Sequence, residues 1–361
     1  MATDLKRITR GELTCWQLRH RGQTMVIAEQ GAQVLEYGRD GEPPILWLSE
    51  QAAYRIGHGV RGGVPVCWPW FGALERNPDS VIQQYTLDNP PAHGLVRQQP
   101  WQLSEQHLGA KQAQLVFRQA EHADGQHLPP ISPTLTITLG DTLTLSLGNH
   151  NHGEHPVTVS QALHTYLAVA DSRHVTVHGL AQSPYVDALA DWQTCQDTHA
   201  LRFNQETDRL YLQLPSQLQV DDPLWKRQIQ LVCRGSHSAV VWNPWVEKSL
   251  RLSQFAPDAW QRMLCIETAN VMGDAVQLVA SASHTLSVSI SVVVSPSSAS
   301  CTVTPTMAPV SRSTACSALG ARCVRPSFSF VIFASGSFGC VQSSLDPFFL
   351  RFRSNRARSA R

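Results

Sequence analysis

The sequence predicts an all-β protein built as a large antiparallel sandwich, and three observations support this prediction. Many short apolar segments alternate with polar residues and are separated by Gly, Pro and Asn, as in the strands of a sandwich. Helical periodicity is scarce. No internal repeat and no alternation of strands with helices is visible, which counts against a dinucleotide-binding domain and against a (β/α)8 barrel.

The clearest predicted element is a hairpin near the middle of the chain. Residues 134–139 and 142–147 both alternate Thr or Ser with apolar side chains, and Gly140-Asp141 between them is a turn sequence. Further strands are expected at residues 13–18, 24–29, 114–118, 157–171, 174–178, 210–214, 228–233, 239–242, 263–267 and 284–293.

The composition indicates a soluble globular protein. The 361 residues carry a formal net charge of +1, and 42% are hydrophobic. Near-zero charge argues against a partner that is a nucleic acid or a membrane surface. No apolar run reaches the roughly 18 residues that span a bilayer, and the N-terminus lacks the apolar core of a signal peptide. We therefore expect a cytoplasmic monomer. The nine cysteines contain no Cys-x-x-Cys and do not read as a disulfide framework.

The last 67 residues differ from the rest in composition. Residues 295–361 contain eight arginines, no lysine, no histidine and one acid, Asp346, so this tail carries +7 and residues 1–294 carry −6. One interpretation is a disordered basic tail that binds an acidic partner. The other is sequence translated out of frame beyond the true end, which we favour. The predicted organisation is one domain over residues 1–294 followed by this tail.

Two strand-like stretches carry a polar side chain among apolar neighbours. His164 lies within residues 157–171, and Glu267 lies between Ile266 and Thr268. A histidine in such a place is often a hydrogen-bonded core residue. A buried carboxylate is costly unless it is paired or functional, and burial raises its pKa toward the range of a general base. We expect the two strands to bring His164 and Glu267 together in one pocket as an acid–base pair.

Two glycine-containing stretches carry arginines. Arg61-Gly62-Gly63 opens a Pro- and Trp-rich run, and its glycines allow a close backbone approach or a positive φ. His93-Gly94 is followed closely by Arg97. Arg61 and Arg97 together could hold an anion, because guanidinium groups match phosphate oxygens; each could also be a surface ion pair.

A carboxylate and several tryptophans suggest a hydroxyl-rich ligand. Asp208 stands at the start of a predicted strand, where it could bind a hydroxyl group or simply make a turn. Indole faces stack on the C–H faces of sugars, but they also fill cores. The tryptophans concerned are Trp68, Trp70, Trp242, Trp245 and Trp260.

A histidine-rich stretch offers a competing interpretation. His150, His152 and His155 have a spacing that can ligate a metal, as in a metal-dependent β-fold enzyme. The stretch also reads as a polar turn between two strands, which we prefer.

Taken in order, these stretches resemble the aldose 1-epimerase (galactose mutarotase-like) superfamily, and within it the hexose-6-phosphate mutarotase branch, glucose-6-phosphate 1-epimerase. The resemblance spans most of residues 10–294. The residues that carry it are Arg61-Gly-Gly-Val-Pro-Val-Cys-Trp-Pro-Trp-Phe-Gly72, His93-Gly94 with Arg97, Ala162-Leu-His164-Thr-Tyr166, Thr207-Asp208-Arg209, Trp242-Asn243-Pro244-Trp245 and Cys265-Ile-Glu267.

The resemblance implies a β-supersandwich and interconversion of the α and β anomers of a hexose 6-phosphate. It makes His164 the general acid and Glu267 the general base, and no metal, nucleotide or redox cofactor is required. It makes His93 and Asp208 contacts to sugar hydroxyls, and Arg61 and Arg97 ligands of the phosphate. Ala92 departs from the branch, whose members often have a polar residue there. The alternative function is a non-catalytic carbohydrate-binding sandwich, which would not need a buried proton-transfer pair.

Overall fold

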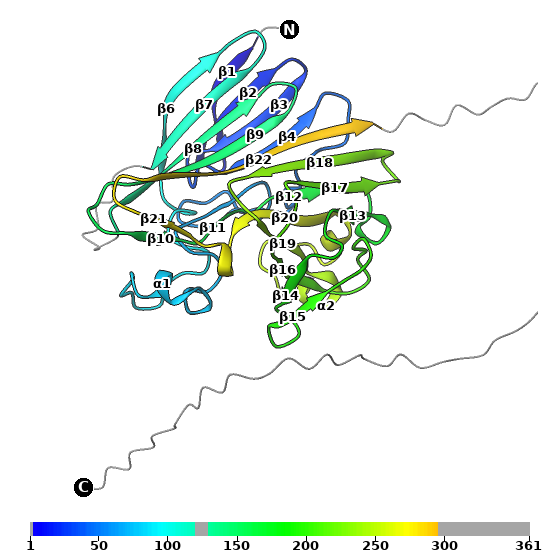
Figure 1. Ribbon diagram of the computed structural model, residues 1–361. Helices are drawn as coiled ribbons and strands as arrows, with labels where there is room; N and C mark the ends of the chain where they lie inside the picture. The colour runs from blue at the N-terminus through cyan, green and yellow to red at the C-terminus, as the bar shows by residue number, and fades with distance from the viewer. Residues whose placement is uncertain (1–2, 120–128, 295–361) are drawn as a thin grey trace, which may run out of the picture. The chain divides into compact units, whose positions relative to one another are not determined.

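The computed structural model describes residues 3–119 and 129–294, which fall within one unit of the chain, Met1–Cys301. Almost all regular structure in the described residues is β, in antiparallel pairs (Figure 1). The all-β antiparallel prediction is confirmed. The predicted tail, residues 295–361, lies outside the described residues, so the proposed domain boundary stays a prediction.

One eight-stranded sheet, here called the β22 sheet, contains the predicted hairpin as β8 and β9. The alternating burial of β8 and β9 puts their leucines in the core and their Thr and Ser side chains outside. The strand order is β13 (Thr176–His178), β17 (Gln217–Asp222), β18 (Arg227–Arg234), β22 (Ser283–Val294), β9 (Leu143–Asn151), β8 (Ile131–Leu139), β7 (Ala113–Gln119) and β6 (Trp101–Leu108).

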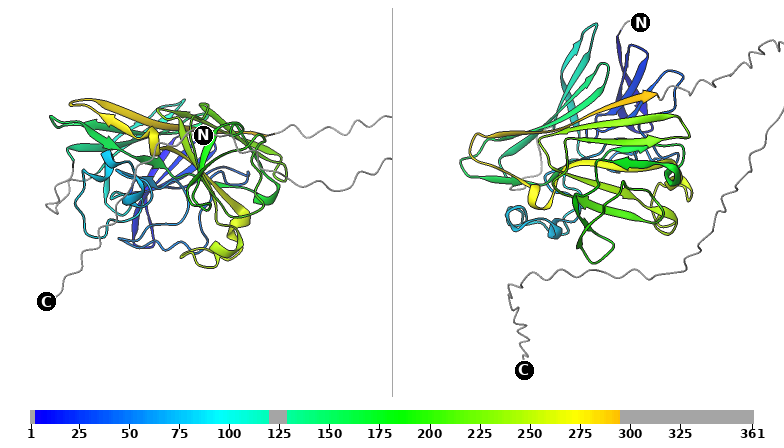
Figure 2. Two further views of the ribbon diagram at one scale, coloured as in Figure 1. Left: turned by 60° about the horizontal axis from the view of Figure 1, so that its bottom comes forward. Right: turned by 45° about the vertical axis from the view of Figure 1, so that its right-hand side comes forward.

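A second eight-stranded sheet, the β20 sheet, packs against it (Figures 1 and 2). Its order is β15 (Gln193–Gln196), β14 (Pro184–Asp187), β16 (Thr207–Tyr211), β19 (Ser238–Asn243), β20 (Met263–Asn270), β11 (Gln161–Leu163) and β5 (Val66–Cys67), while β12 (Tyr166–Ala168) also pairs with β20.

The remaining described strands form two smaller sheets. One is β1 (Asp4–Arg10), β2 (Leu13–His20), β3 (Gln23–Ala28) and β4 (Val34–Arg39), and the other is β10 (Val157–Val159) with β21 (Val276–Leu278). The helices are short: α1 (Asp79–Ile82), α2 (Trp245–Ser249), η1 (Leu74–Arg76), η2 (Ser172–His174), η3 (Ala259–Arg262) and η4 (Met272–Asp274). None in the described part of the chain has the length and apolarity to cross a membrane.

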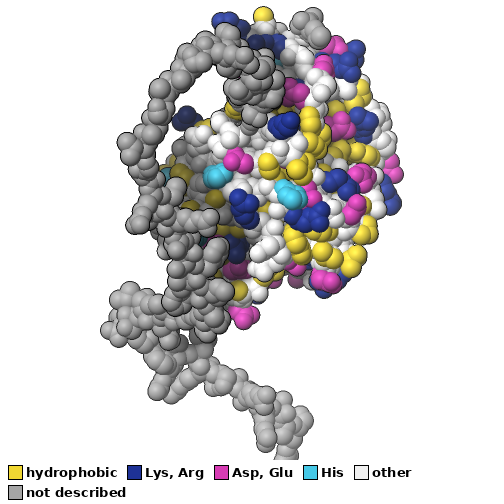
Figure 3. All heavy atoms as spheres, turned by 90° about the vertical axis from the view of Figure 1, so that its right-hand side faces the viewer, with side chains coloured by type: hydrophobic (Ala, Val, Ile, Leu, Met, Phe, Trp, Pro, Cys, Tyr) yellow, Lys and Arg dark blue, Asp and Glu magenta, His cyan; other side chains and the backbone are white. Residues whose placement is uncertain are grey.

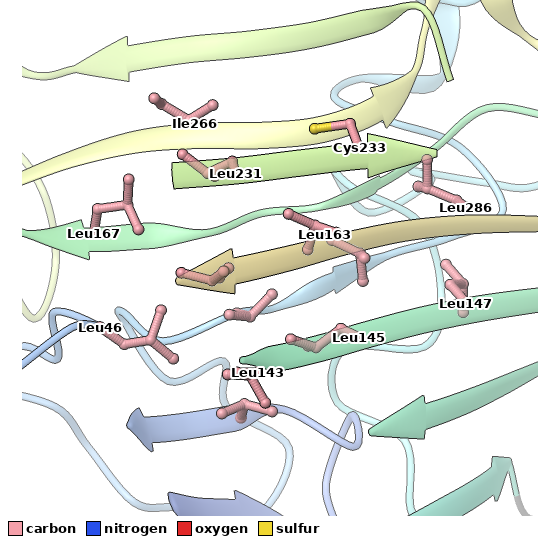
Figure 4. Close-up of a cluster of buried hydrophobic side chains, with 14 of the residues drawn as sticks. Leu46, Leu143, Leu145, Leu147, Leu163, Leu167, Leu231, Cys233, Ile266 and Leu286 are labelled. Carbon is pink, nitrogen blue, oxygen red and sulfur yellow. The ribbon is translucent and has the colours of Figure 1, made fainter. Parts of the chain in front are cut away.

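The main core lies between the two large sheets. Leu143, Leu145 and Leu147 from β9 face Leu163 and Ile266 from the β20 sheet, and all five are fully buried (Figure 4). On the face shown in Figure 3, basic and acidic side chains are interspersed among apolar ones. Because Leu163 and Ile266 point towards β9, the main core uses one face of the β20 sheet, and the other face can carry a site.

Candidate active site

A hollow of about 380 Å³ lies over the second face of the β20 sheet. Because side chains alternate along a strand, Asp208, Val240, Trp242 and Glu267 from three neighbouring strands all point to this face. The volume is in the range of small-molecule sites. Its described lining is Arg61, Phe71, Gly72, Ala73, Arg76, Asn77, His93, His164, Tyr166, Ala188, Trp192, Asp208, Leu210, Val240, Trp242, Glu267, Val271 and Met272.

His164 and Glu267 meet in this hollow. Strands β11 and β12 both pair with β20, and the register is the same on both sides of the gap between them, so His164 comes opposite Glu267. The Nε2 atom of His164 lies 3.3 Å from Oε1 of Glu267. Their exposed fractions are 8% and 2%. The register of β11 and β12 against β20 therefore brings the imidazole of His164 next to the carboxyl group of Glu267.

The prediction of one continuous strand over residues 157–171 is wrong. The segment forms three short strands, β10, β11 and β12, with one break at Ser160, whose N–H donates to the carbonyl of Pro69, and a second at His164-Thr165. There the N–H of His164 donates to the carbonyl of Pro65, and the N–H of Thr165 turns back to the carbonyl of Leu163. This second break occurs because the loop that contains Pro65 takes over the hydrogen bond of His164.

The environment of the pair favours its uncharged forms. Burial raises the pKa of Glu267 well above its usual value, and the nearby Asp208 carboxylate raises it further. Burial lowers the pKa of His164 well below its usual value, and the positive charges of Arg97 and Arg61 lower it further. Within the described residues, His164 Nδ1 and Glu267 Oε2 have no hydrogen-bond partner. Polar atoms left in this condition are costly in a core, and a polar ligand would satisfy them.

His93 lies next to His164, and two hydrogen bonds with Gly72 fix its position. Its N–H donates to the carbonyl of Gly72, and the N–H of Gly72 donates to His93 Nδ1. The rings of His93 and His164 make an edge contact with centroids 5.6 Å apart. Gly94 is required next to it, because a Cβ there would lie 2.0 Å from the carbonyl oxygen of Trp68. Burial, with Arg97 and Arg61, lowers the pKa of His93 to about 3, so its ring is neutral.

Asp208 and Arg61 lie in the same hollow. Burial raises the pKa of Asp208 to about 6, partly offset by Lys248. Arg61 precedes Gly62 and Gly63, which both have positive φ, 117° and 64°. A Cβ at Gly63 would lie 2.1 Å from the carbonyl oxygen of Val34, so the predicted close backbone approach is present.

Arg97 lies in an adjoining hollow of about 510 Å³. Arg61 and Tyr166 line both hollows, so the two meet at these residues. The Tyr166 ring stacks on that of His164, with centroids 4.7 Å apart. Of the six predicted site residues, five share the first hollow and Arg97 lies next to it.

The predicted aromatic residues divide between the core and the site. Trp68 and Trp70 are buried to 3% and 0% exposure and do not line the hollow, whereas Trp242 does. Trp245 and Trp260 make a tilted ring contact with centroids 4.2 Å apart. Tyr166 and Trp192, which line the hollow, were not predicted as site residues. Tyr166 could have been found, because it lies two residues from His164 and shares its face; nothing in the sequence near Trp192 marks it.

The described residues offer one group with metal-ligand spacing. Single ligand atoms from His164, Cys265 and Glu267 lie within 4.8 Å of one another. In the histidine-rich stretch, His150 Nδ1 contacts the Ser283 hydroxyl and His152 Nε2 contacts the Ser132 hydroxyl. Both rings are thus engaged in hydrogen bonds, that of His150 near the C-terminal end of β9 and that of His152 just after it.

The fold and the hollow can be compared with known proteins. A family model described as Aldose 1-epimerase matches residues 14–291. The chain belongs to the aldose 1-epimerase family. It is therefore an isomerase that acts on a sugar, and the alternative of a non-catalytic carbohydrate-binding protein is not supported. The resemblance predicted from the motifs is confirmed.

Individual members of the epimerase family show how similar this chain is to them. A protein of Escherichia coli (strain K12), provisionally named a glucose-6-phosphate 1-epimerase, is 32% identical over 244 residues, 67% of this chain and 78% of that protein. A relative of the same name from Cenchrus ciliaris is 30% identical over 253 residues, 67% and 73% of the two chains. The crystal structure of a provisionally named mutarotase from Salmonella typhimurium has a TM-score of 0.70 and 27% identity, covering 80% of this chain and 93% of that one.

Proposed function

We propose that this epimerase interconverts the α and β anomers of a hexose 6-phosphate, such as glucose 6-phosphate. The observation that carries the proposal is the buried contact between His164 and Glu267 inside a sugar-sized hollow. The names of the relatives support a phosphorylated substrate, and so do Arg61, which lines both hollows, and Arg97, which lines the second.

The proposed reaction opens and recloses the hemiacetal ring. Glu267 removes the proton of the O1 hydroxyl while His164 delivers a proton to the ring oxygen, so that the bond between C1 and the ring oxygen breaks and an aldehyde forms. Rotation about C1–C2 exposes the other face of the carbonyl. Closure reverses both transfers and regenerates the pair. Each positioned proton transfer typically contributes about 10²- to 10⁴-fold in rate.

The pKa directions of the pair oppose the reacting form, but a single proton transfer within the pair produces it. The reaction starts from the form with the proton on His164, whereas burial favours the form with the proton on Glu267. The two forms hold the same number of protons and differ by one transfer across 3.3 Å. The reacting form can thus be reached without exchange of a proton with solvent.

The rest of the hollow binds the substrate in this proposal. Asp208 and His93 contact sugar hydroxyls. Arg61, at the junction of the two hollows, and Arg97, in the second hollow, hold the phosphate, since charged guanidinium groups bind phosphate oxygens through paired hydrogen bonds. The predicted monomeric state and cytoplasmic location stay predictions.

Polarimetry on freshly dissolved α-glucose 6-phosphate tests the proposal. The protein should speed the approach to anomeric equilibrium well above the spontaneous rate, with a higher kcat/KM than for α-glucose. Faster equilibration of α-glucose only would refute the phosphate specificity, and no acceleration of either sugar would refute the assigned reaction.

A further inference from the structure

Trp192 lines the hollow from the edge of the β20 sheet. It directly precedes β15, the edge strand of the β20 sheet, and lies in the connection from β14. Three strand spacings, about 14 Å of backbone, separate β14 from β20, which carries Glu267. The indole is partly buried and packs against an apolar cluster that includes Leu210 and Val240. Trp192 is therefore a wall of the hollow rather than part of the main core.

The backbone at this turn is in an unfavourable conformation for its residues. Asp191 and Trp192 are consecutive residues with φ of 49° and 58°. The left-handed region suits Gly and Asn at the centre of a hairpin turn and disfavours a bulky side chain. Residues kept in such conformations gather at functional sites. Eleven other non-Gly residues of the described chain also have positive φ, so the turn at Trp192 is relevant to the site because its indole lines the hollow.

Arg76 braces the same indole from another loop. Its guanidinium carbon lies 5.0 Å from the centroid of the Trp192 ring, within the range of a cation–π contact. Arg76 ends η1, and the side-chain amide of Asn77 ties this loop together by donating to the carbonyls of Phe71 and Ala73. No ion pair of Arg76 with a carboxylate is present among the described residues.

We propose that Trp192 is a substrate-contact residue whose indole stacks on the C–H face of the sugar ring, and that Arg76 is a positioning residue that holds the indole. The inference rests on the proposed function of the hollow as a sugar site. A sugar ring has hydroxyls around its edge and C–H groups on its faces. Asp208 and His93 can bind the edge, and a face requires a flat apolar partner.

Stacking on the ring makes a different prediction from binding of the phosphate. Trp192→Ala should raise the KM for α-glucose 6-phosphate and for α-glucose by the same factor, about tenfold, with kcat little changed. Trp192→Phe keeps an aromatic face and should stay within about threefold of the wild type. An Ala variant with unchanged KM for both sugars, or with a change confined to the phosphorylated one, would overturn the proposal.

A second measurement does not depend on turnover. Calorimetry with 1,5-anhydroglucitol 6-phosphate, a pyranose that cannot open, should show a Kd raised about tenfold in Trp192→Ala. If the wild type binds this probe but does not interconvert anomers, the proposed reaction fails while the stacking role stands. If wild type and Trp192→Ala bind it equally, the stacking role fails whatever the reaction.

Two further variants separate the indole from its surroundings. Asp191→Gly relaxes the turn and should raise the melting temperature without changing either KM; a KM rise equal to that of Trp192→Ala would mean that the turn, and not the indole, matters.

Arg76→Ala should raise both KM values about threefold at unchanged kcat, and Arg76→Lys should recover most of this because it keeps a cation over the ring. A lower melting temperature with unchanged KM in Arg76→Ala would reduce Arg76 to a structural role.

Discussion

The two faces of strand β20 are both buried but serve different purposes. One face carries Leu264 and Ile266 into the core between the large sheets, where apolar side chains surround them. The other carries Cys265 and Glu267 towards the hollow, where Glu267 has one carboxyl oxygen without a partner among the described residues. One face stabilises the fold. The other holds a reactive carboxyl group whose burial is energetically unfavourable.

Burial alone does not identify a core. All eight residues of β20 are buried, so hydrophobicity cannot separate its faces. The two faces of β20 are distinguished by the alternation of side chains along the strand and by the carboxyl group of Glu267 on one of them. Substitutions on the two faces should therefore have opposite effects on activity and on stability.

The largest expected effect is on activity, from Glu267→Gln. Loss of the proposed base should lower kcat by about 10²- to 10⁴-fold. The melting temperature should stay the same or rise, because a neutral amide replaces a buried carboxyl with an unpartnered oxygen. Polarimetry and thermal unfolding of the same sample measure both. Activity near that of the wild type would refute the assigned base.

Leu264→Ala is the matched change on the core face of the same strand. Removing a fully buried leucine should lower the free energy of unfolding by about 2–5 kcal/mol. The kcat of the folded molecules should remain close to that of the wild type. Urea denaturation and polarimetry give the two values. A variant with normal stability and lost activity would show that the two faces do not divide in this way.

Asp208→Asn tests how much the buried carboxyl group of Asp208 lowers the free energy of unfolding at each pH. The folded-state pKa of Asp208, about 6, lies above its model value of 3.8, so folding favours the protonated form. This carboxyl therefore lowers stability progressively as the pH rises from about 4 to 6, and fully above that. Asp208→Asn should be more stable than the wild type by about 1–3 kcal/mol at pH 7.5 and equally stable below pH 4. Urea denaturation at several pH values checks this; an Asn variant less stable at pH 7.5 would contradict it.

Arg97→Ala sharpens the comparison within the site itself. Loss of a charged hydrogen bond to phosphate should raise the KM for α-glucose 6-phosphate about tenfold or more and leave that for α-glucose unchanged. Arg118→Ala, an exposed arginine on β7 that pairs with Glu105, is the matched control and should change neither KM. Equal losses for the two sugars would refute the assignment to phosphate.

Much of the fold follows from local sequence. The hairpin of β8 and β9 was predictable because Thr and Leu alternate on both sides of a turn. The division of residues 157–171 into three strands was not, since its breaks go with hydrogen bonds from Ser160 to Pro69 and from His164 to Pro65, about a hundred residues away in the chain. The irregular backbone comes from tertiary contacts that periodicity does not record.

The candidate site was predictable where a polar residue interrupts an apolar pattern. His164 and Glu267 stand out in this way, and the structure places them in contact. The separation of Arg97 into the second hollow was not predictable, because it depends on how two loops pack. Trp192 left no signal, because its significance lies in a positive φ and in a contact with Arg76.

The central claim is that His164 and Glu267 act as one proton-transfer unit, and the exchange rate between the anomers of glucose 6-phosphate, followed by NMR at equilibrium, tests it most directly. The rate is compared for the wild type, His164→Gln, Glu267→Gln and the double variant. Because groups that act as a unit are not additive, the double variant should be no slower than the slower single variant. A double variant whose loss equals the product of the two single losses would show that the residues act independently and would contradict the account.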